Sequence, residues 1–339
     1  MRILNMMLGR GAGGIEQAAL DYTRCLQRQG QDVLSIARGG SWFEAALKKE
    51  NLPVYNFNPL GNWDIFTPPL LRYKAPLNTA DHIICHGNKA ALMGLRAFKG
   101  MMPVWGVAHN YHFKYGHKVD HLLSITTHLK NTLVATGIPA TRIHVMPNMI
   151  DCAALTYQAP SPHSPPVIGA FGRFVAKKGF DDYLQALAIL KKQGHLFTAL
   201  LGGAGPLEKK LRAQITHLGL NDRVRYTGWV TDKAAFFQNI NLFCLPSRDE
   251  PFGIILLEAL AAGIPVVTTM TAGPTEIIQD KEALLTPADD PEKLAVSLQT
   301  CLQDPHAATA MAQKGFALVQ FRYTLEAAGQ RLCQYLNGK

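Results

Sequence analysis

Short apolar runs alternate with amphipathic segments along most of this 339-residue chain, and the alternation comes in two blocks. The apolar runs are rich in Val, Ile and Leu, and the segments between them have helical periodicity. This order is typical of βαβ units, in which helices connect parallel strands. Residues 151–166, which include four prolines and two serines, separate the blocks and indicate a linker. The sequence therefore predicts an α/β protein with two doubly wound domains.

The alternation also predicts domain boundaries. We expect an N-terminal domain at residues 1–150, the linker at 151–166, a C-terminal domain at 167–320 and a final helical segment, 321–339, that packs back on the N-terminal domain. The strands expected in the first block are Arg2–Leu8, Asp32–Ala37, Val54–Phe57, His82–Cys85, Pro103–Ala108, Leu122–Ile125 and His144–Met146. The helices expected there are Ile15–Gln29, Trp42–Glu50, Lys89–Phe98 and Thr127–Thr136. The second block is expected to contain strands Val167–Phe171, Phe197–Leu201, Val224–Thr227, Leu242–Leu245 and Ile264–Thr268, helices Asp181–Gln193, Leu207–Leu218, Asp232–Gln238 and Ile254–Ala262, and a mostly helical tail from Pro291 to Leu336.

The composition is that of an ordinary globular protein. Hydrophobic residues make up 47% and charged residues 17%, which excludes a disordered chain, and 339 residues suffice for two full cores. The apolar stretch after Arg2 is expected to be a first strand rather than a signal peptide. The longest apolar run, Ile254 to Val267, is interrupted by a glutamate, a glycine and a proline, so we expect no membrane span. The six cysteines have no metal-binding spacing and are expected to be buried or free thiols of a cytoplasmic protein.

Positive charge is concentrated in the first half of the chain. Residues 1–165 hold 16 Lys and Arg against 9 Asp and Glu, a net charge of +7, whereas residues 166–339 hold 18 against 16, a net charge of +2. This difference predicts either that the first domain faces an anionic partner or that excess charge keeps its surface solvated.

Two glutamates eight positions apart frame the most informative segment. Glu250 precedes a Pro-Phe-Gly turn, and Glu258 lies inside the apolar helix that this turn begins. A buried carboxylate is costly unless it is hydrogen-bonded, and a helix that begins after Gly253 offers free backbone N–H groups to an anion. Together these features predict a site for a phosphate ligand that carries hydroxyls, such as a sugar nucleotide.

The pattern E-P-F-G-I-I-L-L-E-A-L-A-A-G-I-P-V-V, from Glu250 to Val267, resembles the E-x7-E signature of retaining, nucleotide-sugar-dependent glycosyltransferases of the GT-B fold. The resemblance implies an α/β GT-B protein, with two Rossmann-like doubly wound domains that face each other across a cleft. It also implies a retaining hexosyltransferase that moves a sugar from a nucleoside-diphosphate sugar, with a UDP-sugar as the expected donor, to an acceptor hydroxyl. In such enzymes the departing phosphate assists proton removal on the same face of the sugar, and the protein positions the substrates and stabilises the leaving diphosphate.

The resemblance assigns roles within the glutamate motif. Glu250 is expected to contact hydroxyls of the donor sugar and to act as a catalytic residue, and Glu258 is expected to accept from the ribose hydroxyls. Backbone N–H groups of Phe252, Gly253 and Ile254 are expected to bind the donor between them. The competing interpretations are a structural salt bridge for Glu258 and a charge that favours the helix dipole for Glu250.

A basic loop follows the first expected strand of the second block. The segment from Gly172-Arg173 to Lys177-Lys178-Gly179 resembles the family's G-R-x-x-x-x-K-G pattern, in which the Arg and the Lys hold the donor diphosphate. The resemblance therefore assigns catalytic and donor-binding roles to Arg173 and Lys178, with Lys177 as a rival for the second role. A guanidinium and an ammonium suit a diphosphate whose charge grows as it leaves.

Two further segments of the second block are donor-binding candidates. The glycine-rich segment from Gly202 to Pro206 resembles the family's G-x-G-P loop, and Gly203 is the position expected to approach the donor. The Gly228-Trp229-Val230 segment resembles the part of the family that packs against the nucleobase, so Val230 is a donor-binding candidate. Trp229 is either part of this contact or a large core side chain.

The first block contributes a glycine loop and a histidine. Gly13 and Gly14 belong to a segment that resembles the family's glycine-rich loop, which reaches towards the donor phosphates and the acceptor. Glu16 occupies the third glycine position of a dinucleotide-binding fingerprint, which disfavours that alternative. His109 follows an expected strand, where many members of the family have a histidine near the sugar or the acceptor, and we assign it a catalytic role.

No cofactor is expected besides the donor substrate. The chain has no D-x-D triplet that would clamp a metal on the diphosphate, so we expect no metal requirement. The expected partners are the nucleotide-sugar donor, an anionic, glycan-linked or lipid-linked acceptor, and the anionic inner face of the cytoplasmic membrane, where this otherwise cytoplasmic protein would bind peripherally. The expected membrane contacts are Lys48, Lys49, Arg72, Lys74, Arg96, Lys99, Lys114 and Lys118, with Trp42, Phe43, Trp63 and Phe66.

The family often builds lipopolysaccharide, capsule or glycolipid, so we expect a role in the biosynthesis of a cell-envelope glycan such as lipopolysaccharide. Two alternatives use the same scaffold: a sugar-nucleotide epimerase or hydrolase, and a catalytically silent sugar-nucleotide-binding protein. A nucleic-acid-binding function is disfavoured because the sequence has no aromatic-basic module or helix-turn-helix signal.

Overall fold

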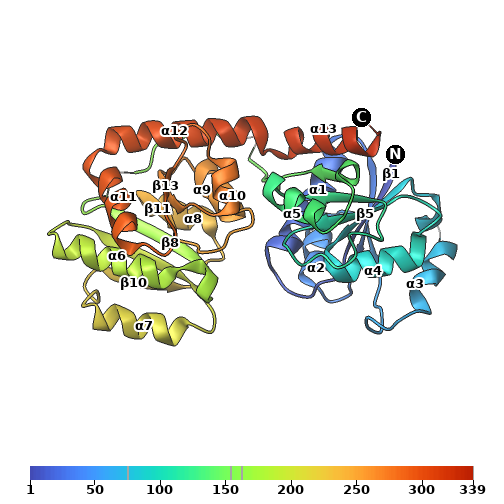
Figure 1. Cartoon of the computed structure of the whole chain (residues 1–339), viewed down its shortest axis with the longest axis horizontal. Helices are drawn as coiled ribbons and strands as arrows, with labels where there is room; N and C mark the ends of the chain where they lie inside the picture. Colours follow the sequence, from blue (N-terminus) through green and yellow to red (C-terminus); the bar gives the residue numbers. More distant parts are fainter. Residues whose placement is uncertain (75, 153–154, 162, 339) are drawn as a thin grey trace. The chain divides into compact units, whose positions relative to one another are not determined.

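The computed structural model describes residues 1–74, 76–152, 155–161 and 163–338. Contacts divide the chain into two compact units, which we call unit 1 (Met1–Ala153 and Arg322–Lys339) and unit 2 (Ala154–Phe321). Each unit has a parallel β-sheet between layers of helices (Figure 1). Residues 153, 154 and 162 of the predicted linker, and Lys339 of the predicted C-terminal segment, lie outside the described residues.

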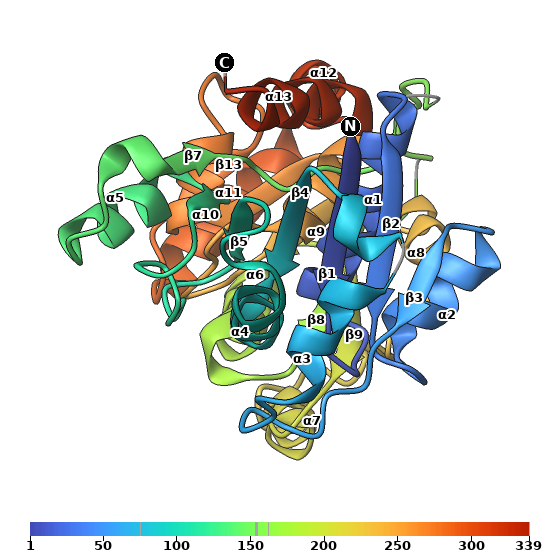
Figure 2. The same ribbon diagram turned by 90° about the vertical axis from the view of Figure 1, so that its right-hand side faces the viewer.

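Within its described residues, unit 1 has a seven-stranded parallel sheet of order β3-β2-β1-β4-β5-β6-β7. The strand order reverses between β1 and β4, which pair side by side (Figure 2). The strands are β1 (Arg2–Met7), β2 (Asp32–Ala37), β3 (Val54–Asn56), β4 (His82–His86), β5 (Val104–Ala108), β6 (His121–Ser124) and β7 (Ile143–Val145). The helices are α1 (Gly14–Arg28), α2 (Trp42–Lys49), α3 (Thr67–Leu70), α4 (Gly87–Phe98), α5 (Thr127–Ala135) and α13 (Leu325–Leu336), with 3-10 turns η1 (Leu71–Tyr73), η2 (Leu77–Thr79) and η3 (Ala140–Arg142).

Alternate residues of the central strands of unit 1 serve opposite faces of the sheet. Ile84 of β4 packs in a core with Tyr22 of α1 and Leu332 of α13. On the other face, a side chain at Gly94 of α4 would meet Cys85. The C-terminal helix α13 is therefore part of this unit's core, and a parallel bridge between Ile150 and Thr324 marks where the chain returns to it.

Within its described residues, unit 2 has a six-stranded parallel sheet of order β10-β9-β8-β11-β12-β13, whose order reverses between β8 and β11. The strands are β8 (Val167–Arg173), β9 (Thr198–Ala204), β10 (Val224–Gly228), β11 (Leu242–Leu245), β12 (Val266–Thr269) and β13 (Leu284–Thr286). The helices are α6 (Phe180–Lys192), α7 (Glu208–His217), α8 (Lys233–Gln238), α9 (Ile254–Ala261), α10 (Ala272–Ile277), α11 (Pro291–Gln303) and α12 (Pro305–Arg322), with a 3-10 turn η4 (Ala176–Lys178).

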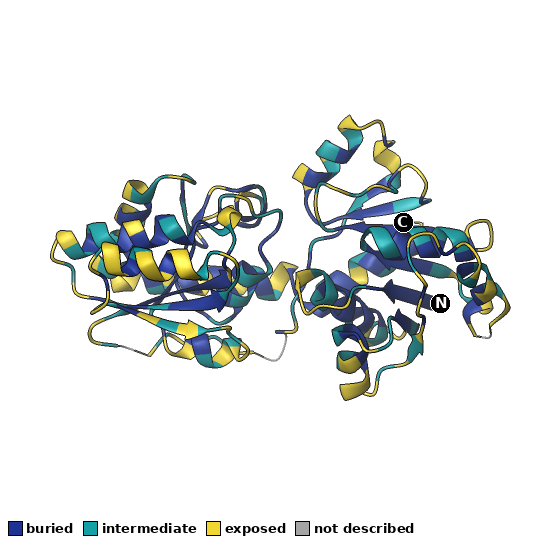
Figure 3. Ribbon diagram, turned by 90° about the horizontal axis from the view of Figure 1, so that it is seen from below, coloured by how far each residue is buried: buried dark blue, intermediate teal, exposed yellow. Residues whose placement is uncertain are grey.

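Helices cover both faces of the unit 2 sheet at its centre, so strands β8, β11 and β12 are buried along most of their length, whereas the edge strand β10 has exposed residues (Figure 3). One face packs against α6, α7 and α11 through residues such as Leu201, Leu187 and Leu298. The other carries Phe171, whose ring lies 4.9 Å from that of Phe236 on α8 and 5.4 Å from that of Phe243 on β11. Burial on both faces explains why these strands read as continuous apolar runs in the sequence.

The predicted elements of both blocks are present, and β2 and β11 have the predicted bounds. The prediction missed α3, α10 and β13, which have at most six residues each. Helix α10 was missed because Gly273 and Pro274 are residues typical of turns, although proline is tolerated in the first turn of a helix. No helix in the described parts of the chain is long and apolar enough to cross a bilayer. All six cysteines are free thiols.

Candidate active site

The predicted donor-binding residues of unit 2 follow the carboxyl ends of its parallel strands. Arg173 ends β8, Gly203 lies near the end of β9, Val230 follows β10, and Glu250 follows β11. Because all these strands run parallel, their carboxyl ends meet at one edge of the sheet. The β8 and β11 loops are neighbours at the reversal of strand order, which is where ligands bind in doubly wound sheets.

Lys178 and Glu250 form an ion pair between these two loops. Lys178 Nζ donates to Glu250 Oε2, and the two side chains are only 16% and 12% exposed. Ser247 Oγ lies 3.3 Å from the same carboxylate oxygen. The rival Lys177 is 53% exposed and lies 3.6 Å from Asp249. Lys178, rather than Lys177, therefore contacts the predicted sugar-binding glutamate.

Arg248 holds the two loops together from the outside. Its Nη1 lies 2.7 Å from Asp181 Oδ1 and its Nη2 2.7 Å from Asp182 Oδ2, both at the start of α6, and its Nε contacts Asp289. Its backbone N–H donates to the carbonyl of Lys177 over 2.8 Å. No role was predicted for this arginine, although it opens the motif, because its three carboxylate partners lie 40 or more positions away in the chain.

Gly179 allows the two loops to approach closely. It has a positive φ of 61°, and a Cβ built on it would lie 2.0 Å from the carbonyl oxygen of Pro246. A side chain is excluded here by both space and backbone conformation. The glycine of the basic loop thus places Lys178 against the β11 loop.

The N-terminus of α9 presents uncapped backbone amides. Its N-cap residue, Gly253, has a φ of 101° and no side chain to accept from them. Gly273 of the unpredicted helix α10 supports the preceding turn, because its N–H donates to the Glu250 carbonyl over 3.0 Å and a Cβ on it would lie 2.0 Å from the Phe252 oxygen. The first amides of α9, which begins at Ile254, are therefore held ready for an anion.

Glu258 has one paired and one unpaired carboxylate oxygen. Its Oε1 accepts from Lys233 Nζ over 2.6 Å, whereas its Oε2 is buried and has no hydrogen-bond partner among the described residues. Burial raises the pKa of Glu258, and the Lys233 ammonium opposes that shift. A salt bridge exists, as one interpretation predicted, but it leaves a buried acceptor unsatisfied, which is costly unless a ligand donates to it. Lys233, at the start of α8, was not predicted, since 25 positions separate it from Glu258.

Arg173 is exposed at the end of β8 and has no ion-pair partner in the parts of the chain that the structure describes. Its guanidinium is thus available to a ligand, unlike that of Arg248. Gly203 lies against the β8 loop, where a Cβ on it would be 2.1 Å from the Gly172 oxygen. Gly203 thus lets the β8 and β9 loops pack together, and this close approach excludes any larger residue at the position.

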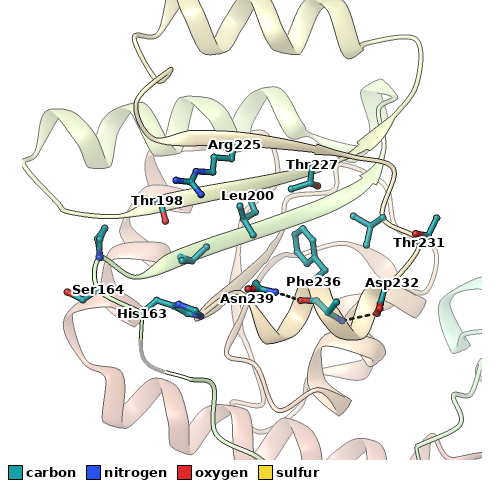
Figure 4. Close-up of a pocket in the computed structure, with 14 residues that line it drawn as sticks. His163, Ser164, Thr198, Leu200, Arg225, Thr227, Thr231, Asp232, Phe236 and Asn239 are labelled. Atoms are coloured by element: carbon teal, nitrogen blue, oxygen red, sulfur yellow. Dashed lines mark hydrogen bonds between the residues drawn. The ribbon is translucent and has the colours of Figure 1, made fainter.

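Val230 lines a pocket of about 610 Å³ on the β9–β10 side of the sheet (Figure 4). Leu200 and Phe236 supply apolar walls, and Arg225 and Thr227 supply polar groups. The volume suits a small ligand. Trp229, beside Val230, is 56% exposed, so the interpretation of this residue as a core side chain is wrong.

In unit 1, the predicted glycine loop follows β1 at the other reversal of strand order. Gly13 is the N-cap residue of α1 with an extended backbone, and Gly14 is the first residue of the helix. The Glu16 carboxylate folds over the loop, because a Cβ on Gly9 would lie 2.4 Å from its Oε1 and one on Gly13 3.0 Å from its Oε2. Both predicted glycines are exposed.

His109 follows β5 and begins a chain of polar contacts into the core of unit 1. Its Nε2 lies 3.1 Å from His86 Nδ1, and His86 Nε2 lies 2.8 Å from Asn5 Oδ1. Burial lowers the pKa of His109 to about 4, and it lowers the pKa of His86 well below the ordinary value. Sequence reasoning missed His86 and Asn5, whose only signal was their position in two strands that flank the reversal point.

The predicted membrane contacts divide into exposed and structural residues. Trp63 and Phe66 are 92% and 77% exposed, whereas Phe43 is fully buried, so its assignment to a membrane surface is wrong. Phe43 packs between α1 and α2 because it lies on the inner face of its helix. No cluster of three or more metal-binding side chains occurs in the described ranges.

The family model described as "Glycosyl transferases group 1" matches residues 155–317, and the model described as "Glycosyltransferase Family 4" matches residues 12–154. The chain belongs to the group 1 glycosyltransferases. This glycosyltransferase is 25% identical to the lipopolysaccharide core biosynthesis glycosyltransferase LpsE of Rhizobium meliloti over 350 residues, which cover 100% of both chains.

Two further similarities extend the comparison. This glycosyltransferase is 31% identical to the lipopolysaccharide core biosynthesis mannosyltransferase LpcC of Rhizobium leguminosarum over 166 residues, which cover 47% of each chain. The crystal structure of Alr3699/HepE from Anabaena in complex with UDP matches with a TM-score of 0.85 at 23% identity, covering 100% of both chains. The structural likeness shows that the predicted two-domain GT-B fold is correct.

Proposed function

We propose that this glycosyltransferase transfers a sugar, with retention, from a UDP-sugar to an acceptor hydroxyl in the biosynthesis of a cell-envelope glycan. The observation that carries the proposal is the buried, unpartnered Oε2 of Glu258, one turn beyond the uncapped N-terminus of α9. An acceptor atom and a set of amides at this spacing suit a ligand with both hydroxyls and phosphates. The matched Alr3699/HepE structures, which contain UDP or UDP-glucose, support the choice of nucleotide.

Each group in unit 2 has a task in the proposal. Glu258 Oε2 accepts from the ribose hydroxyls, and Val230 contacts the nucleobase through its main chain. The amides of Phe252, Gly253 and Ile254 bind phosphate oxygens. Glu250, fixed by Lys178 and Ser247, accepts from hydroxyls of the donor sugar.

The chemical step needs stabilisation of the leaving diphosphate more than it needs a protein nucleophile. Arg173 and Lys178 supply two positive charges, and α9 supplies the positive end of its dipole. The Lys178 ammonium has three N–H donors, so it donates to a phosphate oxygen as well as to Glu250 in this proposal. The departing phosphate oxygen then accepts the proton of the acceptor hydroxyl on the face it leaves, which gives retention. Gly13 and Gly14 complete the proposal as backbone donors that approach the phosphates or the acceptor.

Donor binding by a Glu258→Ala variant tests the proposal. Titration calorimetry with UDP-sugars should show affinity reduced about 10–100-fold, because a hydrogen bond to a charged group contributes about 1.5–3 kcal/mol. Glu292→Ala, at an exposed glutamate of α11, is the matched control and should bind like the wild type. If Glu258 were only the partner of Lys233, Glu258→Ala and Lys233→Met would lose stability alike and bind donor normally, which would refute the ribose assignment.

We also propose that the acceptor is presented at an anionic membrane surface, at the cytoplasmic face that was predicted from the sequence. Unit 1 carries an apolar loop at residues 60–73, which ends in the short helical elements α3 and η1, and six of its large hydrophobic side chains are more than half exposed. They are Leu60, Trp63, Ile65, Phe66, Leu70 and Tyr73. The names of the relatives, which act in lipopolysaccharide core biosynthesis, support an envelope acceptor.

Hydrogen bonds from side chains to the backbone fix the conformation of the apolar loop. The buried Asp64 accepts from the backbone N–H groups of Leu60 over 2.9 Å and of Thr67 over 2.9 Å. Arg96 Nη1 donates to the Asp64 carbonyl over 2.9 Å, and Arg72 donates to the Ala97 carbonyl. These two arginines were predicted as lipid contacts. Their N–H groups donate to backbone carbonyls and fix the loop, and their positive charges lie next to it. Aromatic side chains on a fixed protrusion flanked by cations suit an anionic bilayer.

Sedimentation with vesicles tests the membrane contact. The wild type should pellet with phosphatidylglycerol vesicles at low salt more than with phosphatidylcholine vesicles. Trp63→Ala combined with Phe66→Ala should weaken partitioning about 100–10,000-fold, because each of the two aromatic side chains contributes about 1.5–3 kcal/mol when buried. Phe321→Ala, at an exposed aromatic residue of α12, should change nothing. Wild-type protein that stays in the supernatant would refute the proposal.

A further inference from the structure

The polar chain behind His109 determines which of its ring nitrogens carries a proton. Asn5, on β1, is fully buried, and its Nδ2 donates to the Ala19 carbonyl over 2.7 Å and to Thr23 Oγ1 over 2.9 Å. A carbonyl can only accept, so the opposite orientation of the amide would place two acceptors together. The orientation of Asn5 is therefore fixed, and its Oδ1 faces His86.

The proton positions of both histidines follow in turn. Asn5 Oδ1 only accepts, so His86 Nε2, 2.8 Å away, carries a proton and donates to it. His86 is 2% exposed, and its surroundings hold it neutral, so its single ring proton is on Nε2 and its Nδ1 is a bare acceptor. His109 Nε2, 3.1 Å from that Nδ1, must then carry its own proton and donate. Neutral His109 is left with an unprotonated Nδ1.

That Nδ1 is available to a ligand. His109 is only partly buried, and among the described residues its ring makes its hydrogen bond through Nε2, not Nδ1. Tyr22 packs edge-on against His86, with ring centroids 4.8 Å apart, and a flipped His86 ring would put carbon atoms in place of both nitrogens and lose both hydrogen bonds. Both hydrogen bonds therefore donate towards the core, from His109 to His86 and from His86 to Asn5.

We propose that His86 and Asn5 are positioning residues that fix His109 in the Nε2–H tautomer, so that His109 offers a bare Nδ1 to a hydroxyl of the sugar donor or the acceptor. The identity of this hydroxyl rests on the proposed function, whereas the tautomer does not. At neutral pH His109 accepts a hydrogen bond and cannot donate one from Nδ1. Its pKa of about 4 also makes it a weak base, so its part is to orient a hydroxyl rather than to remove the proton.

Nitrogen-15 NMR of the histidine rings in the free protein tests the tautomer without any substrate. At pH 7 both His109 and His86 should show a protonated Nε2 and a pyridine-type Nδ1. The His109 signals are identified as those lost in a His109→Gln variant. A protonated Nδ1 on either ring would overturn the proposal, and this result would leave the donor-binding tests of unit 2 unaffected.

A His86→Gln variant tests the positioning role. The ring nitrogens of His109 should shift towards values averaged between the two tautomers, and kcat should fall about tenfold while the KM for the donor changes little. His121→Gln, at another partly buried histidine of unit 1, should leave both the His109 signals and kcat unchanged. Unaltered His109 signals in His86→Gln would refute the role of His86, whatever happens to stability. If His86→Gln does not fold, the wild-type spectrum still decides the tautomer.

Discussion

The two units differ in the groups that they place at the carboxyl edges of similar sheets. Unit 2 gathers charge there: Arg173, the Lys178–Glu250 pair and a half-satisfied Glu258. Unit 1 has charges around its edge as well, but its reversal point between β1 and β4 holds a neutral chain of two histidines, whose pKa values are lowered, and a buried asparagine. In the proposed function, the charged edge of unit 2 binds an anionic leaving group and the neutral chain of unit 1 orients an uncharged hydroxyl.

Three glycines in loops of the two units differ in how well they tolerate a side chain. Gly179→Ala should destabilise the protein by about 2–5 kcal/mol, since left-handed strain adds to the overlap with the Pro246 carbonyl. Gly194→Ala, which has a positive φ and open space, should cost only about 1–2 kcal/mol. Gly13→Ala in unit 1 has an extended backbone and meets only the flexible Glu16 side chain, so it should cost the least. Denaturant unfolding measures the order, and an equal cost at all three sites would contradict it.

The adjacent lysines of unit 2 should differ sharply in catalysis. Lys178→Met should reduce kcat about 100–1000-fold, the usual effect of removing one donor to a developing charge. Lys177→Met should change kcat by less than about threefold, because exposed ion pairs contribute little. Steady-state rates with a UDP-sugar and an envelope-lipid acceptor provide the comparison. Equal losses would mean that the loop needs positive charge in general and not an ammonium beside Glu250.

Acid should weaken unit 1 before unit 2. The histidines whose pKa burial lowers all lie in unit 1: His82, His86, His109, His121 and His144. Their folded pKa values lie below the ordinary value of 6.5, so the unfolded chain binds more protons as the pH falls from about 6.5 towards 4. Stability present above pH 6.5 is therefore lost in that window, by at least about 1–2 kcal/mol at pH 5.

Hydrogen exchange at pH 7 and pH 5, corrected for intrinsic rates, locates this loss. Amides of β1, β4 and β5 should lose protection, while those of β8 and β11 keep theirs. Greater loss in unit 2 would contradict the contrast between the units.

Chelation should have the smallest effect. With no D-x-D triplet in the chain, transfer in excess EDTA should stay within about twofold of the untreated rate, whereas removal of a catalytic metal costs orders of magnitude. Activity lost in chelator and restored by Mn²⁺ or Mg²⁺ would show that unit 2 meets the diphosphate with a metal as well as with Arg173 and Lys178.

The sequence predicted what is local and missed what depends on distant partners. Strand β11 and helix α9 were found because an apolar run and a Pro-Phe-Gly turn mark them directly. Lys233 and Arg248 were missed as contacts, because their carboxylate partners lie far along the chain. The three-residue β13 was missed because so short a run has no readable period. His86 was missed because nothing in the sequence of a strand shows that its last side chain will contact a histidine 23 positions later.

Hydrogen exchange with and without donor tests the central claim most directly. The claim is that the carboxyl edge of unit 2 holds a nucleoside-diphosphate sugar with cations, helix amides and two glutamates. Saturation with a UDP-sugar should slow exchange in residues 173–179, 202–205, 228–233 and 247–258. A UDP-, GDP- or ADP-sugar that binds but protects other segments of unit 2, or the failure of all three to slow exchange in these segments, would contradict the claim.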